Sequence, residues 1–98
     1  MDQTPPDPAE LPINGELDLH TFRPQDLGAL LPEFVFECRK RGILEVRVVH
    51  GKGRAQLARG VHALLGRMPE VVSFAFATPP YGGHGATIAR LKPLDASA

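Results

Sequence analysis

The sequence predicts a two-layer α/β fold with the element order β-α-β-α-β-β, a four-stranded mixed sheet and two helices on one face. Apolar and polar residues alternate in several short segments, as they do in half-buried strands. Two intervening segments instead carry apolar residues at helical spacing. A strand-helix-strand unit is almost always a right-handed crossover between parallel strands, so the first three strands should run parallel. A length of 98 residues suits one domain of this kind.

Four segments have the alternation or the β-branched content of strands: residues 16–20, 43–49, 71–77 and 86–92. In the first segment the two leucines point to the core, while Asp18 and His20 share the opposite face. Glu45, Arg47 and Arg90 also alternate away from the apolar positions of their strands. One face of the sheet should therefore be at least partly open.

Two helices are expected between these strands. The first begins near Pro24, ends before Gly42, and has apolar residues at helical spacing: Leu27, Leu30, Leu31, Phe34 and Cys38. Pro32 lacks an N–H group and crowds the preceding turn, so we expect a kink or two abutting helices there. The second helix follows the turn at residues 50–53 and ends before Pro69, with a stripe formed by Leu57, Val61, Leu64 and Leu65. Residues 78–85 read as a loop.

The composition indicates one domain at residues 15–93, preceded by a flexible proline-rich leader at 1–14 and followed by a tail at 94–98. The single cysteine, Cys38, excludes an intrachain disulfide, is expected in the core, and favours a reducing, cytoplasmic location. No apolar run reaches the roughly 18 residues that a membrane span requires. The acidic N-terminal segment does not resemble a secretory signal.

Charge is distributed unevenly along a chain whose formal net charge is zero. Residues 1–37 hold eight acidic residues and one basic residue, whereas residues 38–98 hold ten basic and three acidic ones. A basic C-terminal part suits a polyanionic partner such as nucleic acid. A set of solvated surface charges explains the same bias equally well, and composition alone does not separate the two.

Histidines gather where the parallel strands should end. Ligands of open α/β sheets usually bind at the carboxyl edge, which here collects His20, the turn at residues 50–53 and the loop at 79–85. A carboxylate such as Asp18 can orient a nearby imidazole and raise its pKa, which suits acid–base chemistry. The alternative is a surface Asp and His at a strand end.

The His50-Gly51-Lys52-Gly53 turn leads into a helix. Glycines allow a ligand close to the backbone, and free N–H groups at a helix start favour phosphate. The glycines could instead serve turn geometry only, and the glycines near His84 could serve a hairpin loop. His62 reads as a surface histidine without a role. The lone cysteine and the wide spacing of the histidines do not indicate a zinc site.

Together, Leu17-Asp18-Leu19-His20, His50-Gly51-Lys52-Gly53 and Gly82-Gly83-His84-Gly85-Ala86-Thr87 resemble the signature stretches of the Smr (small MutS-related) domain family. The resemblance implies a sandwich of helices on a four-stranded sheet, similar to the C-terminal domain of bacterial translation initiation factor three. It also implies endonuclease activity, by nicking DNA or by cutting RNA, including messages on stalled ribosomes. Asp18 and His20 match the motif residues linked to cleavage.

We therefore predict Asp18, His20 and His50 as catalytic residues. The predicted nucleic-acid contacts are Arg47, Gly51, Lys52, Gly53, Arg54, Gly82, Gly83, Gly85 and Arg90. Two departures from the family pattern stand out. Many members have glycine where this chain has Thr21, and His84 receives no role because many members have another residue there.

Two functions stay open on the sequence: an endonuclease, and a non-catalytic module that binds nucleic acid or the ribosome. The sequence identifies no certain cofactor and leaves a divalent metal ion, Mg²⁺ or Mn²⁺, open. In RNA the 2′-hydroxyl is an internal nucleophile, so a histidine mechanism needs no metal. In DNA a water must attack, which favours a divalent ion such as Mg²⁺ or Mn²⁺. The few clustered carboxylates argue against a two-metal site.

Overall fold

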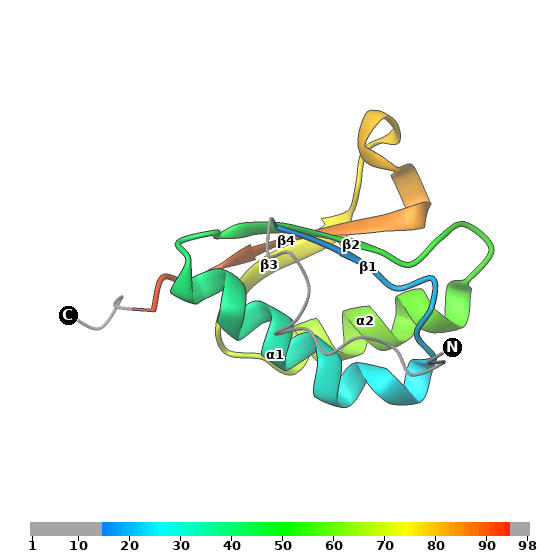
Figure 1. The fold of residues 1–98 in the computed structure, drawn as a ribbon. Helices are drawn as coiled ribbons and strands as arrows, with labels where there is room; N and C mark the ends of the chain where they lie inside the picture. Colours follow the sequence, from blue (N-terminus) through cyan, green and yellow to red (C-terminus); the bar gives the residue numbers. More distant parts are fainter. Residues whose placement is uncertain (1–14, 95–98) are drawn as a thin grey trace, which may run out of the picture.

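The computed structural model describes residues 15–94 and contains the expected order of strands and helices (Figure 1). The strands are β1 (Glu16–Asp18), β2 (Glu45–Val49), β3 (Val71–Phe76) and β4 (Ala86–Leu91). They form one mixed sheet in the order β1-β2-β4-β3. β1 and β2 are parallel, and β4 is antiparallel to both of its neighbours, so the first three strands share one direction as the crossover rule predicted.

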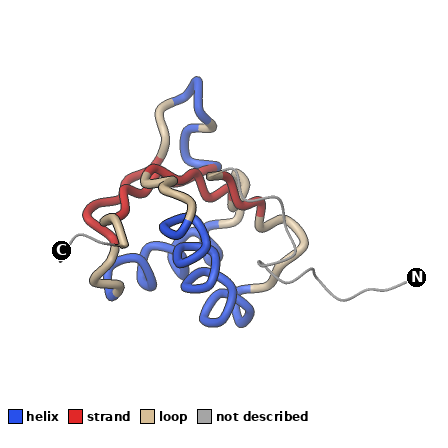
Figure 2. The backbone as a smooth tube through the Cα atoms, turned by 60° about the vertical axis from the view of Figure 1, so that its left-hand side comes forward, coloured by secondary structure: helices blue, strands red, loops and turns tan. Residues whose placement is uncertain are grey.

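Helices α1 (Leu27–Lys40) and α2 (Ala55–Arg67) pack side by side on one face of this sheet, which confirms the two-layer architecture (Figures 1 and 2). The core lies between the two layers. It contains the apolar stripes of both helices and the inward residues of the strands: Leu17, Val46, Val48, Leu30, Leu31, Phe34, Val35, Leu57, Val61, Leu65, Ala89 and Leu91. Cys38 is fully buried there, as expected. No helix in residues 15–94 is long and apolar enough to cross a membrane. The expected leader at residues 1–14 and residues 95–98 of the expected tail lie outside the described residues.

The first helix begins near Pro24, as expected, and accommodates two prolines. Pro24 begins a short 3₁₀ turn, η2 (Pro24–Asp26), which precedes the α-helix. Beyond it, α1 is one continuous helix that contains Pro32, so the expectation of two abutting helices is wrong. The hydrogen bond that Pro32 cannot make would reach the carbonyl of Gly28. Gly28 is exposed, so water can bind that carbonyl, while the buried residues around Pro32 hold the helix against the sheet.

The segment between β3 and β4, expected as a loop, contains two 3₁₀ turns, η3 (Pro79–Tyr81) and η4 (Gly83–Gly85). It rises from the sheet on the side away from the helices (Figure 1). Arg47 fixes its position: the Nε–H of Arg47 donates to the carbonyl of Tyr81 at 2.8 Å, and the same guanidinium pairs with Glu16 on β1. The open face of the sheet thus carries a short structured arm.

Candidate functional site

The two glycine-rich segments are joined to each other through their backbones. The N–H groups of His50 and Gly51 both donate to the carbonyl of Gly85, at 3.0 and 2.8 Å. A Cβ atom on Gly85 would lie only 3.2 Å from both the backbone nitrogen and the Cγ of Lys52. Gly51 has a φ of +91°, a conformation that residues with a side chain rarely adopt. Glycine is therefore required where the turn and the arm meet.

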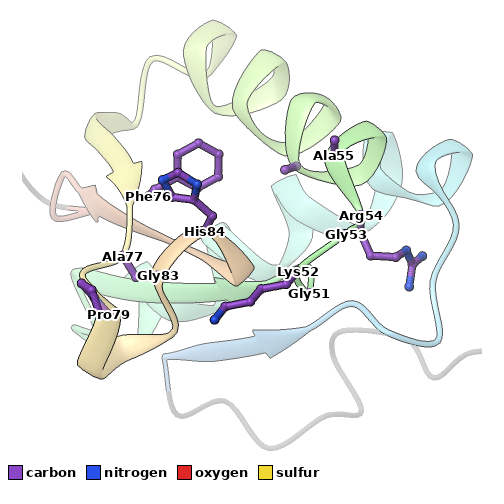
Figure 3. A pocket seen from close by; sticks show the side chains of 11 residues that line it. Gly51, Lys52, Gly53, Arg54, Ala55, Phe76, Ala77, Pro79, Gly83 and His84 are labelled. Carbon is purple, nitrogen blue, oxygen red and sulfur yellow. The ribbon is translucent and has the colours of Figure 1, made fainter.

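A pocket of about 740 Å³ opens beside this junction (Figure 3). Residues 51–54 and the first turn of α2 form one wall, and the end of β3 and the arm form the other. The wall from β3 and the arm includes Phe76, Pro79, Gly83 and His84. The pocket therefore combines two cationic side chains, Lys52 and Arg54, with an aromatic ring and an imidazole.

His84 lies against Phe76 at the pocket wall, with ring centroids 4.6 Å apart and an interplanar angle of 35°. Phe76 remains 41% exposed, which is unusual for so large an apolar ring. The sequence analysis gave neither residue a role. Their contact depends on how the arm folds. The alternation of residues within β3 does not predict the fold of the arm.

Behind the pocket, a buried threonine links two histidines. The Oγ1 atom of Thr87 on β4 lies 2.9 Å from Nε2 of His50 and 2.8 Å from Nε2 of His62. A hydroxyl has one proton and free lone pairs, so it can donate to one ring and accept from the other. Thr87 thus connects the turn after β2 to helix α2.

His62 was expected at the surface, and this expectation is wrong. It is half-buried and contacts the rings of Phe74 and Phe76, with centroids 5.1 and 4.7 Å away. The sequence did contain a signal, because residues 58, 62 and 65 follow the spacing of one helix face and residues 58 and 65 are buried.

Burial lowers the pKa of both linked histidines. For His50, burial lowers the pKa by more than the hydrogen bond with the Gly51 backbone raises it, and the neighbouring His62 lowers the pKa further. For His62, burial is the cause. Both rings are therefore predominantly neutral near pH 7. In this state one Nε2 atom can donate a hydrogen bond to the Thr87 hydroxyl while the other accepts one from it.

Asp18 and His20 form a pair on the exposed end of β1. Oδ1 of Asp18 accepts hydrogen bonds from the backbone N–H and the ring Nδ1–H of His20, each at 3.0 Å. Burial raises the pKa of Asp18, but these hydrogen bonds and the charges of His20 and Arg47 outweigh it, and the net effect is a lowered pKa. The carboxylate is therefore charged and holds the ring in one orientation.

The three predicted catalytic residues reach the same edge of the sheet but leave it by different faces. Asp18 pairs in register with Val49, the residue before His50, and the Leu19 N–H donates to the Val49 carbonyl. Asp18 and His20 are exposed, whereas His50 is 1% exposed and contacts α2. The structure brings Asp18 and His20 together and places the ring of His50 in the interior, where it supports the turn.

Comparison with known proteins identifies this arrangement. The Smr domain family matches residues 17–92. The chain belongs to the Smr domain family.

Two relatives of the same name show how far the similarity extends. The chain is 34% identical over 77 residues to the endonuclease MutS2 of Thermotoga petrophila, a match that covers 79% of this chain and 10% of the relative. It is 40% identical over 76 residues to endonuclease MutS2 of Solidesulfovibrio magneticus, covering 78% of this chain and 10% of that protein. The chain thus spans about a tenth of the length of these relatives.

Among solved structures, the Smr domain of Thermus thermophilus MutS2 superposes with a TM-score of 0.76 at 34% identity, covering 82% of this chain and 100% of that one. YdaL, a stand-alone small MutS-related protein from Escherichia coli, gives a TM-score of 0.71 at 26% identity, covering 80% and 64% of the two chains. These matches agree with the two-layer fold and the mixed sheet described above.

The other predicted contact residues of this Smr domain fall into three groups. Gly51, Lys52, Gly53, Arg54 and Gly83 line the pocket. Gly82 and Gly85 instead pack inside the arm and its junction, where added Cβ atoms would meet neighbours at 3.0 and 3.2 Å. Arg47 and Arg90 lie on the open face and are paired with Glu16 and Glu45.

The described part of this Smr domain offers no protein-only metal site. Within residues 15–94, no three His, Cys, Asp or Glu side chains are grouped so that they could hold one ion. The Asp18–His20 pair supplies two ligating groups at most.

Proposed function

We propose that this Smr domain is a nucleic-acid endonuclease in which His20 is the acid–base residue and Asp18 positions it. The observation that carries the proposal is the contact between Asp18 Oδ1 and His20 Nδ1 at 3.0 Å. It fixes the ring through Nδ1 and leaves Nε2 free to take or give a proton. The His20 side chain is 74% exposed, so a phosphodiester can reach it.

The mechanism follows from which nucleophile the substrate supplies. With RNA, Nε2 of His20 would remove the proton of a 2′-hydroxyl, whose oxygen then attacks the adjacent phosphorus. The bond to the 5′-oxygen breaks, a 2′,3′-cyclic phosphate forms, and the leaving 5′-oxygen takes a proton from water. With DNA, His20 would deprotonate an attacking water instead. Lys52 and Arg54 at the same edge of the sheet would attract the phosphate backbone and stabilise the charge that develops.

The names of the MutS2 relatives support this proposal, since each is described as an endonuclease. The pocket cations also favour a second candidate function, a module that binds nucleic acid without cutting it. Within residues 15–94 neither Lys52 nor Arg54 takes part in an ion pair, whereas Arg47 and Arg90 do. Unpaired cations beside a pocket serve binding whether or not cleavage follows.

Cleavage assays on point variants test the proposal. The substrates are labelled single-stranded RNA, structured RNA and supercoiled DNA, each with magnesium, with manganese and with a chelator. Loss of a general acid or base typically lowers a rate by about 100- to 10,000-fold, which is the loss expected for His20→Ala. Asp18→Asn keeps the shape of the side chain and should show a smaller loss. Glu33→Gln, an exposed carboxylate on α1, is the matched control and should cleave like the wild type.

The outcomes separate the two functions. Cleavage by the wild type that survives both His20→Ala and Asp18→Asn would show that other residues are the catalysts. Tight binding without cleavage of any substrate under any metal condition would establish the binding module instead. His20→Ala removes an exposed side chain, so unchanged far-UV circular dichroism should accompany any loss of activity.

A further inference from the structure

We propose that the pocket between His84 and Lys52 holds one unpaired nucleotide, with its base stacked on the imidazole of His84. The inference rests on the proposed nucleic-acid function and specifies its substrate class, namely single-stranded or unpaired segments. Nothing in the motif comparison assigned a role to His84 or Phe76.

The pocket has the dimensions of a site for a small ligand. Its volume of about 740 Å³ lies within the range of roughly 300–1,000 Å³ that is usual for such sites. It is bounded by backbone and small residues at Gly51, Gly53, Ala55 and Gly83, which leave room for a planar group. Figure 3 shows the aromatic wall of Phe76 and His84 and the Lys52 side chain extending from the turn toward the arm, whereas the Arg54 side chain points away from the two rings.

His84 supplies a supported stacking surface. The Phe76 ring lies 4.6 Å from the His84 ring at an interplanar angle of 35°, and 4.7 Å from the His62 ring at 48°, so the exposed His84 ring is supported from behind by a row of tilted ring contacts. Within residues 15–94, the His84 side chain makes no hydrogen bond that would have to be broken. A base placed on its outer face would extend this row, and base–aromatic stacking tolerates any base.

The charges of the opposite wall suit the phosphate of the same nucleotide. Lys52 and Arg54 line the pocket and have no carboxylate partner among the described residues. An aromatic face on one wall and the Lys52 ammonium on the other match the two ends of a nucleotide, while Arg54 adds positive charge at the edge of the pocket and points away from the rings (Figure 3). In a duplex, neighbouring base pairs cover both faces of each base, so only an unpaired base can enter.

A single tryptophan makes the stacking measurable, because the wild-type chain contains none. His84→Trp enlarges an exposed ring, and its fluorescence should be quenched when a base stacks on it. The ligands are a short oligothymidylate, the same strand made of base-free sugar phosphates, and a blunt duplex, all in chelator. Phe36→Trp on α1, another exposed ring and not part of the pocket, is the matched control. Binding itself is followed independently by anisotropy of labelled strands.

The proposal predicts a contrast between ligands. His84→Ala should weaken binding of oligothymidylate by roughly 5- to 150-fold, the usual range for one stacked base, and should leave the base-free strand unaffected. His84→Trp should restore affinity and be quenched by oligothymidylate only. Phe36→Trp should bind normally without quenching.

Three results would overturn the inference. If oligothymidylate binds without quenching His84→Trp and His84→Ala binds it as tightly as the wild type, the base pocket is wrong while nucleic-acid binding stands. If the duplex quenches as strongly as the single strand, the substrate class is wrong. If the wild type binds none of the three ligands and also does not bind labelled single-stranded RNA, the inference fails together with nucleic-acid binding; cleavage of RNA without binding of any single strand would sink the inference alone.

Discussion

Replacing Thr87 with valine removes one buried hydroxyl and keeps the shape of the side chain. Thr87 is fully buried, and its Oγ1 is the hydrogen-bond partner of Nε2 in both His50 and His62. His50 is 1% exposed, so its ring cannot recover the lost bond from water, and an unsatisfied buried polar group costs about 1–3 kcal/mol. His62 is half-buried and can be solvated in part. We therefore expect Thr87→Val to lower the free energy of unfolding by about 2–3 kcal/mol.

Urea unfolding at neutral pH, followed by far-UV circular dichroism, measures this loss. Thr87→Ser is the matched control, because it keeps the hydroxyl and removes one methyl group, which should cost about 1 kcal/mol. The valine variant should thus be the less stable of the two, although valine is the more apolar residue. A valine variant within about 0.5 kcal/mol of the wild type, or one more stable than the serine variant, would refute the role of the shared hydroxyl.

Three further outcomes follow from particular contacts. Changing Lys52 and Arg54 together to glutamate should weaken nucleic-acid binding on all sequences. The slope of log affinity against log salt concentration, measured by anisotropy, should fall by the amount expected for the loss of about two phosphate contacts. Burial lowers the pKa of His62 from its ordinary 6.5, so the unfolded chain takes up the proton first. Stability should therefore fall as the pH drops below about 6.5, and His62→Gln should flatten this slope in thermal unfolding across the same pH range. Gly85→Ala places a Cβ atom against the Lys52 backbone and should lower the free energy of unfolding by about 1–2 kcal/mol in the same urea assay. Gly28→Ala is the contrasting substitution: its Cβ meets no neighbour within α1, and it should raise the free energy of unfolding by up to about 1 kcal/mol.

The layers of the fold could be predicted because they follow from local pattern and chain order. Alternation around Leu17 and Val48 marks strand faces, and the crossover rule makes consecutive strands parallel. The position of β4 between β2 and β3 had no such signal, because strand order is decided by pairing between distant segments. At Pro32 the alternative of two abutting helices is wrong, because tertiary packing of the buried residues around Pro32 outweighs the local cost of a proline inside a helix.

The edge of the site could be predicted from the same topology, but its geometry only in part. The Asp18–His20 contact follows from two residues that share one strand face. The inward direction of His50 continues the alternation from Val48, yet the glycines after it made a surface turn the simpler interpretation. The contact between Phe76 and His84 depends on how the arm folds in space, which a pattern along one segment does not contain.

The central position of β4 has a consequence for how the domain is assembled during synthesis. β4 is the last strand to leave the ribosome, yet β3 pairs with no other strand in the sheet. Until β4 emerges, only β1 and β2 can pair, and the apolar faces of the helices stay partly uncovered by the sheet. The same strand brings Thr87 to the histidines, and the turn just before it brings the Gly85 carbonyl. A chain shortened before residue 86 would therefore lack the completed sheet and the walls of the pocket together.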